Sequence, residues 1–288
     1  MKPPPLDYAR PETVEEAVAT LAEHGDEAKV LAGGQSLMPL LAMRFARPAV
    51  LVDVNRVAGL DAIAEADGTL RVGAVVRQND LAASALARRA VPLATRAIPW
   101  IGHFVTRNRG TVGGSIAHAD ARGELPLALA ALDGRAIVAS TRGRRELTAG
   151  ELFVTHFTTS LEPDELLVET VWPVAGPGWG FAFEELAQRA GDYALGMVAV
   201  ALRADGGRVA GARVAVGAAV DRPARLAAAE AALAGRAVDD EASREAGAAA
   251  AAAVDPPDDL HASGRYRRHL VGLLVERAVL AAWREAAA

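Results

Sequence analysis

The feature that most constrains this sequence is a pair of short segments, each with two adjacent glycines followed by a hydroxyl residue. The first is Ala32-Gly33-Gly34-Gln35-Ser36 and the second is Thr111-Val112-Gly113-Gly114-Ser115. Glycine has no Cβ, so the backbone can take a positive φ and an oxygen atom can approach the main-chain N–H groups. Successive exposed N–H groups bind anions, and a helix that begins just after them adds its positive end. Two such segments brought together would suit two linked phosphates.

For either segment alone, an ordinary tight turn is the competing interpretation. The occurrence of the same chemistry twice favours the phosphate interpretation. Neither segment matches the pattern GxGxxG, and the pattern GxxxxGK[ST] does not occur in the chain. The expected diphosphate site is therefore neither of the Rossmann type nor of the Walker type.

Composition excludes several other classes of protein. The chain has 288 residues, a net charge of −5 and no cysteine. An acidic chain without a basic stripe does not suit nucleic acid. Without cysteine it forms no disulfide and ligates no conventional iron–sulfur cluster. No apolar stretch is long enough to cross a bilayer and no secretory signal is visible, so we expect a cytoplasmic protein without a transmembrane segment.

Hydrophobic patterning predicts an α+β chain in two parts. In residues 1–175 short helices and strands alternate. The segment 174–180 is rich in glycine and proline and is the best candidate for a linker. Residues 178–286 are expected to form a C-terminal α+β domain in which strands precede helices.

Local signals place the two glycine segments differently. The first is expected to follow a short strand over 29–32, and the second to lie in a turn-rich stretch over 107–115.

Thr13 and Glu16 predict a capping box at the start of a helix. Further expected elements are a hairpin over 63–75, a mostly helical stretch over 80–98, strands over 166–172, 181–185, 195–203 and 208–220, and helices over 223–233, 240–254 and 266–284.

Longer motifs around these segments resemble a known family. They are AGGQSLMPLLAMRFARP (32–48), RNRGTVGGSIAHADARGELP (107–126) and FTTSLEPDELLVETVWP (157–173). In this order they resemble the FAD-binding medium subunit of molybdenum hydroxylases, the family of carbon monoxide dehydrogenase and of multi-subunit xanthine, nicotine and aldehyde dehydrogenases. The resemblance implies an FAD-binding domain of vanillyl-alcohol-oxidase (PCMH) type over 1–175, with subdomains at roughly 1–55 and 56–175. A C-terminal α+β domain of the carbon monoxide dehydrogenase flavoprotein type would follow it over 178–286.

The resemblance also implies positions for the cofactor. The pyrophosphate loops would be formed by Ala32, Gly33, Gly34, Gln35 and Ser36 and by Thr111, Gly113, Gly114 and Ser115. Ile101 and Gly102 lie where the family chain passes close to the cofactor, and Glu124 lies where an acidic residue bonds the adenosine ribose. Leu167 falls in the segment near the adenine. Tyr193 falls near the isoalloxazine ring, which its flat face would suit.

Two departures from the family pattern are Gln35, where relatives carry His, and Ser115, where others carry Asn. Both residues remain polar, so we expect phosphate binding to survive. With no cysteine and no histidine inside either segment, the FAD is expected to be noncovalent. His118 is either close to the flavin or structural. Arg107 and Arg109 either offset pyrophosphate charge, face a partner or are solvated.

The implied function is electron transfer within a larger molybdenum hydroxylase. A molybdopterin-binding large subunit would oxidise the substrate, and the [2Fe-2S] clusters of a small subunit would pass electrons to FAD on this chain and then to an external acceptor. A dimer of heterotrimers is the expected assembly. No catalytic residue is expected here, because this scheme requires no side-chain general base. No metal ligand is expected either, because the histidines lack ligand spacing. A stand-alone flavin-dependent oxidase or reductase and a flavin-free scaffold subunit stay open as alternatives.

Overall fold

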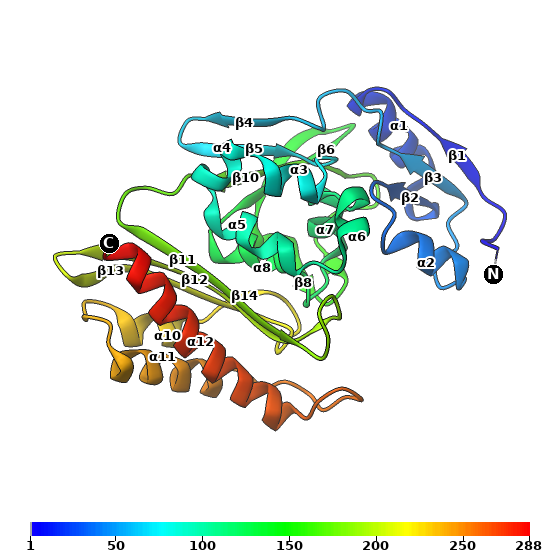
Figure 1. The fold of residues 1–288 in the computed structure, drawn as a ribbon. Coiled ribbons are helices and arrows are strands. Elements are labelled where there is room, and N and C mark those ends of the chain that lie inside the picture. Colours follow the sequence, from blue (N-terminus) through cyan, green and yellow to red (C-terminus); the bar gives the residue numbers. More distant parts are fainter. Residues whose placement is uncertain (1) are drawn as a thin grey trace.

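Three hydrophobic cores organise the chain in the computed structural model, which describes residues 2–288 (Figure 1). One core lies in the N-terminal subdomain, one beside a five-stranded sheet and one under the C-terminal sheet. Helices and strands are interspersed throughout, so the expected α+β class is confirmed.

The N-terminal subdomain is built on a three-stranded sheet in the order β1 (Asp7–Ala9), β3 (Val50–Asp53) and β2 (Ala28–Leu31). Both pairings are parallel. Adjacent parallel strands end at the same edge of the sheet, so the chain leaves β2 and β3 side by side. The first glycine segment follows β2 and Asn55 follows β3, and the two are therefore brought together.

Helix α1 (Val14–His24) covers this sheet and begins at Thr13, whose side chain accepts a hydrogen bond from the Glu16 N–H at 3.1 Å. The Glu16 carboxylate accepts from the N–H of Glu12, not from that of Thr13. Only half of the expected capping box is therefore formed. A short 3₁₀ turn, η1 (Gly25–Glu27), leads into β2, and α2 (Leu37–Ala42) follows the first glycine segment.

The middle subdomain contains an antiparallel sheet in the order β4 (Ile63–Ala66), β5 (Thr69–Gly73), β10 (Leu166–Pro173), β6 (Arg135–Ser140) and β7 (Gly143–Thr148). The expected β4–β5 hairpin and the strand β10 are confirmed. The β6–β7 hairpin was not expected. Strand β7 is an edge strand whose residues are exposed except for Leu147, so it shows little of the hydrophobic alternation by which strands are recognised.

Short helices cover one face of this sheet, and α1 packs toward the other (Figure 1). They are α3 (Gln78–Ala83), α4 (Ala85–Ala90), α5 (Pro92–Ala97), the 3₁₀ turn η2 (Ile98–Trp100), α6 (Phe104–Arg109), α7 (Val112–His118), α8 (Glu124–Ala131) and α9 (Ala149–Leu152), with a small hairpin of β8 (Phe153–Thr155) and β9 (Thr158–Thr159). The stretch expected to be mostly helical with a break near Pro92 is three helices, because Ser84 caps α4 and Pro92 opens α5.

The second glycine segment is helical, which corrects the turn-rich stretch expected over 107–115. Helix α6 runs to Arg109, and α7 begins at Val112 with Thr111 as its N-cap. A Cβ on Gly113 would lie 2.6 Å from the Cα atom of Ala74. This glycine therefore lets α7 lie directly against the backbone that follows β5, and the low helix propensity of glycine is overridden by packing.

The C-terminal part is an antiparallel sheet of β11 (Trp179–Ala187), β12 (Ala194–Asp205), β13 (Arg208–Gly217) and β14 (Ala224–Arg225), with the helices α10 (Ala227–Leu233), α11 (Asp240–Ala252) and α12 (Gly264–Ala286). The helix expected from residue 223 begins at Ala227 because β14 occupies residues 224–225. No helix among residues 2–288 is both long and apolar enough to cross a membrane.

Strand β12 is buried on both faces. Val198 and Val200 lie in the core with α12, whereas Met197 and Ala199 lie in the core of the middle subdomain. Strands buried on both faces read as continuous apolar runs, which explains the uncharged stretch at 193–202. The C-terminal sheet thus lies between α12 on one side and α5 and α8 on the other (Figure 1).

Candidate functional site

The two glycine segments are in direct contact, although they belong to different subdomains. A Cβ on Gly33 would lie 2.5 Å from the carbonyl oxygen of Arg109 and 2.8 Å from the Cα atom of Gly110. A Cβ on Gly114 would lie 3.7 Å from that of Ala32. Any side chain at position 33 would push the segments apart, so this glycine is required by the close approach of two backbones.

The first segment presents free backbone donors. Within residues 2–288, the N–H groups of Gly33, Gly34, Gln35 and Ser36 make no intramolecular hydrogen bond. Gly34 has a φ of +73°, which an L side chain rarely adopts. The Gln35 side chain turns back and donates to the Gly33 carbonyl at 3.0 Å. Consecutive N–H groups without a partner form the donor set that an anion requires.

The second segment uses its backbone donors internally. Its N–H groups donate from Val112 to Val76 O at 2.9 Å, from Gly113 to Ala74 O at 3.0 Å, and from Gly114 and Ser115 to the hydroxyl and carbonyl oxygens of Thr111, both at 3.1 Å. The expectation that free amides of both segments converge is therefore corrected: it applies to the first segment only. What the second segment offers is the half-buried Ser115 hydroxyl and the Thr111 N–H, which has no acceptor within residues 2–288.

Two residues that were not expected from the sequence connect the segments. Asn55 donates to the Ala32 carbonyl at 2.9 Å, and Arg77 donates to the Arg109 carbonyl at 2.6 Å. A sequence signal for Asn55 existed, because a polar residue directly after a buried parallel strand lies at the edge where ligands are held. Arg77 carries no such signal.

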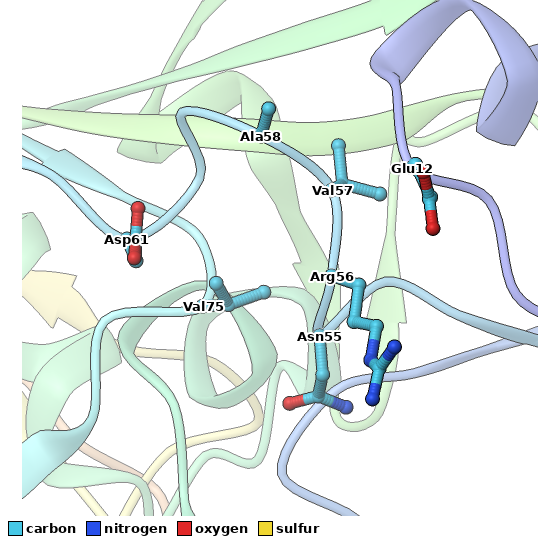
Figure 2. A pocket seen from close by; sticks show the side chains of 7 residues that line it. All are labelled: Glu12, Asn55, Arg56, Val57, Ala58, Asp61 and Val75. Atoms are coloured by element: carbon cyan, nitrogen blue, oxygen red, sulfur yellow. The ribbon is translucent and has the colours of Figure 1, made fainter.

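Asn55 also lines a cavity of about 470 Å³ (Figure 2). The side chains of Glu12 and Asp61 line it together with Arg56. Two carboxylates and one guanidinium carry a net negative charge, so this cavity does not suit a diphosphate.

A second group of expected residues gathers around His103. Gly191 has a φ of +87°, and a Cβ there would lie 2.6 Å from the His103 ring, so the 188–193 loop packs on the segment that holds Ile101 and Gly102. Tyr193, at the end of this loop, is 66% exposed. Its ring is therefore available to a planar partner.

The two arginines before the second segment have different surroundings. The guanidinium of Arg107 donates to the carbonyls of Ile101 at 2.8 Å and Gly102 at 3.0 Å, so it holds the backbone of that segment. Arg109 is exposed and makes no ion pair among residues 2–288.

Carboxyl groups cluster where α8 meets the C-terminal sheet. Burial raises the pKa of Glu124, the first residue of α8, to about 7, although the nearby Arg107 opposes the shift. Burial and the charge of Glu124 raise the pKa of Glu185 to about 8. Glu185 is 7% exposed and its Oε2 atom has no hydrogen-bond partner. Burial, then the charges of Asp120 and Glu124, raise the pKa of Tyr193, so its phenol borders this cluster.

Glu185 was missed in the sequence, although a signal was present. On β11 it continues the alternation of Phe181 and Phe183, both of which face the core of the middle subdomain. A carboxyl at a core-facing position is uncommon, and such positions mark candidate functional residues.

Leu167 lies in a strand of the middle sheet and is buried. It pairs with Val138 in the sheet, and its side chain, 4% exposed, belongs to the middle core. Ala74, against which Gly113 packs, donates to the carbonyl of the next residue, Val168, at 3.0 Å, so the strand of Leu167 lies beside α7. His118 is half-buried beside Phe157, with ring centroids 4.8 Å apart, and burial lowers the pKa of its imidazole.

Comparisons with known proteins agree along the whole chain. A family model described as the FAD binding domain in molybdopterin dehydrogenase matches residues 4–175, and one described as the CO dehydrogenase flavoprotein C-terminal domain matches residues 181–282. The chain is 42% identical over 281 residues to the 6-hydroxypseudooxynicotine dehydrogenase complex subunit alpha of Paenarthrobacter nicotinovorans, which covers 96% of this chain and 94% of that protein.

Solved structures share the fold. Carbon monoxide dehydrogenase from Hydrogenophaga pseudoflava aligns with a TM-score of 0.96 and 39% identity, covering 99% of both chains. Quinoline 2-oxidoreductase from Pseudomonas putida 86 aligns with a TM-score of 0.95 and 36% identity, also over 99% of both chains. The names of these three relatives state different substrates at similar identities, so the likeness does not select a substrate.

Proposed function

Because the chain belongs to the family of FAD-binding medium subunits of molybdenum hydroxylases, we propose that it holds FAD noncovalently where the two glycine segments meet and transfers electrons within a larger oxidoreductase. Residues 1–175, with subdomains at roughly 1–55 and 56–175, would bind the cofactor, and residues 178–286 would form the C-terminal domain.

The contact at Gly33 is the observation that carries this proposal. Its missing side chain lets two backbones meet, and four consecutive free N–H groups lie beside the contact. The pyrophosphate would accept hydrogen bonds from Gly33, Gly34, Gln35 and Ser36 on one side, and from the groups of Thr111 and Ser115, next to Gly114, on the other. These donors fit a diphosphate in number and chemistry.

The remaining expected residues would hold the rest of the cofactor. Glu124 would accept hydrogen bonds from the adenosine ribose, and the sheet at Leu167 would lie near the adenine. Ile101, Gly102 and Tyr193 would border the isoalloxazine ring, since Gly191 joins their two segments through His103. The chain has no cysteine and neither glycine segment contains histidine, which supports noncovalent binding.

Flavin exchanges electrons singly or in pairs, and the protein's task is to hold and orient it. We assign the [2Fe-2S] clusters that supply the electrons to a small subunit and the molybdopterin to a large subunit, in a dimer of heterotrimers in the cytoplasm. The chain's lack of cysteine supports this division of cofactors. The names of relatives, which include a complex subunit alpha and medium chains, support a multi-subunit assembly.

Titration of the purified full-length chain with FAD tests the proposal. We expect saturable binding of one FAD per chain, with the flavin released on denaturation because it is noncovalent, and no reduction of the flavin by a small alcohol alone. A chain that takes up no FAD would contradict the proposal and favour a scaffold. Reduction of the bound flavin by a small alcohol without partner subunits would contradict it in favour of a stand-alone oxidase.

A further inference from the structure

Two polar side chains form a continuous hydrogen-bonded bridge between the first glycine segment and Arg109, which directly precedes Gly110 and the second segment. The Nδ2 atom of Asn55 donates to the Ala32 carbonyl at 2.9 Å. The Nη2 atom of Arg77 donates to Oδ1 of Asn55 at 2.7 Å, and its Nη1 atom donates to the Arg109 carbonyl at 2.6 Å. One guanidinium and one amide thus connect the carbonyl groups that lie next to Gly33 on both sides of the contact.

The bridge determines which way the first segment presents its donors. In a trans peptide the C=O and N–H groups point in opposite directions. Asn55 holds the Ala32 carbonyl, so the N–H of Gly33 in the same peptide is directed away from the bridge. This N–H has no acceptor within residues 2–288. The bridge therefore orients the first free donor of the segment before any anion arrives.

The bridge is itself fixed in place. Asp53 accepts from the backbone N–H of Asn55 at 2.9 Å and from its Nδ2 atom at 2.6 Å. The Tyr8 hydroxyl donates to the other carboxylate oxygen of Asp53. The amide of Asn55 is consequently held in one orientation by β1 and β3, with its oxygen toward Arg77.

Arg77 also brings a positive charge that no carboxylate contacts. Its two bonded nitrogen atoms donate to uncharged oxygens, and it makes no ion pair among residues 2–288. The charged groups that act on it are the guanidinium of Arg109 and the carboxylates of Asp80 and Asp53, neither of which forms an ion pair with it. A half-buried guanidinium without a paired anion, next to consecutive free N–H groups, is suited to a diphosphate.

We propose that Asn55 and Arg77 are positioning residues for the diphosphate of the cofactor: their bridge sets the spacing of the two glycine segments and directs the free N–H groups of the first. This inference rests on the proposed function, since it concerns how FAD is held. Within residues 2–288, all hydrogen bonds of the two side chains go to Ala32, Asp53 and Arg109 or join the two residues to each other, so we expect their effect to be confined to the diphosphate.

The test compares FAD affinity in the full-length chain for the wild type, Asn55→Ala, Arg77→Lys and Arg77→Met. Loss of the bridge should weaken FAD binding about tenfold in each variant. Lysine keeps the charge, but one ammonium does not reproduce the two-pronged guanidinium, so Arg77→Lys should not restore binding. The double variant Asn55→Ala with Arg77→Met should bind about as weakly as each single variant, because both remove one unit.

The matched control is Arg71→Met. Arg71 is on β5, the strand that precedes Arg77, and its side chain pairs with Glu169. Within residues 2–288 it makes no hydrogen bond to either glycine segment. It should bind FAD as the wild type does. The ³¹P resonances of bound FAD should shift in the bridge variants and not in the control, whereas the visible spectrum of the flavin should stay unchanged in all of them.

The outcomes separate this inference from the function on which it rests. A wild-type chain that binds no FAD contradicts the proposed function. Wild-type binding together with unchanged affinity in Asn55→Ala or Arg77→Lys overturns the bridge. Weakened binding with unchanged ³¹P shifts and a lower unfolding temperature of the FAD-free chain also overturns it, because the residues would then be merely structural.

Discussion

The two glycine segments each contain two adjacent glycines and a serine, but they have different structures. In the first, four consecutive N–H groups are free, and glycine is needed for a backbone contact at Gly33 and for a positive φ at Gly34. In the second, the N–H groups of residues 112–115 are used internally, and Gly113 serves to pack α7 against Ala74. The first segment offers backbone donors. The second offers the Ser115 hydroxyl, and its backbone is packed against the rest of the chain.

The difference follows from what surrounds each segment. The first leaves the edge of a parallel sheet, where no neighbouring strand takes up its N–H groups. The second lies beside the segment after β5, whose carbonyls at Ala74 and Val76 accept its first donors. Adjacent glycines therefore indicate a close approach of backbone, which Arg109 and Gly110 make at Gly33 and Ala74 makes at Gly113. They do not indicate whether the N–H groups beside that contact stay free.

Alanine at Gly33 and alanine at Gly113 should give the largest effects, the first on FAD affinity and the second on stability. Gly33→Ala places a Cβ 2.5 Å from the Arg109 carbonyl and separates the segments, so FAD affinity should fall about ten- to hundredfold. Gly113→Ala places a Cβ 2.6 Å from Ala74 and should lower the free energy of unfolding by about 1–3 kcal/mol. Flavin titration and denaturant unfolding of both variants check this.

The opposite assignment would break the comparison. If Gly113→Ala lost FAD at unchanged stability while Gly33→Ala retained it, the second segment would be the main diphosphate donor. Gly150→Ala is the control, because a Cβ there meets no atom within 4 Å.

The two hydroxyl residues of the second segment should also differ in role: Ser115 should affect FAD binding, and Thr111 should affect stability. Both effects should be smaller than those of the glycine variants. Ser115→Ala removes a half-buried hydroxyl with no other described partner and should weaken FAD binding about tenfold. Thr111 is 2% exposed and caps α7 through the Gly114 N–H. Thr111→Val should therefore cost about 1 kcal/mol of unfolding free energy. Thr111→Ser keeps the cap and should restore stability, and failure to do so would contradict the capping role.

Much of this arrangement was predictable from the sequence. Apolar patterning and turn residues predicted the strand before the first segment, the β4–β5 hairpin and the C-terminal strands. The sequences of the three longer motifs indicated the family. The helix at 112–118 was missed because Gly113 and Gly114 are poor helix formers, and only the contact with Ala74 requires glycine there.

The bridge could not be derived locally. Asn55 and Arg77 are separated along the chain from both glycine segments, and only the pairing of β2 with β3 and the packing of α7 bring them together. Contacts between residues distant in sequence depend on topology, which one sequence does not display.

The smallest effect is expected away from both segments, at Glu185. The pKa of this carboxyl is raised by burial from 4.5 to about 8, so between these values the folded state holds a proton that the unfolded state has lost. Stability should therefore fall as the pH rises through this interval. Glu185→Gln should make this slope shallower, because only the contribution of Glu124 then remains, and should stabilise the FAD-free chain by about 1 kcal/mol at the alkaline end. Thermal unfolding at several pH values checks this, and an unchanged slope would contradict the assignment.

The central claim, that the first glycine segment donates its backbone N–H groups to the diphosphate, is tested most directly by amide NMR of the ¹⁵N-labelled full-length chain titrated with FAD. The amide resonances of Gly33, Gly34, Gln35 and Ser36 should move strongly, whereas those of residues 112–115 should move little because their hydrogen bonds are already formed. Large shifts confined to residues 112–115, with the first segment unmoved, would contradict the account.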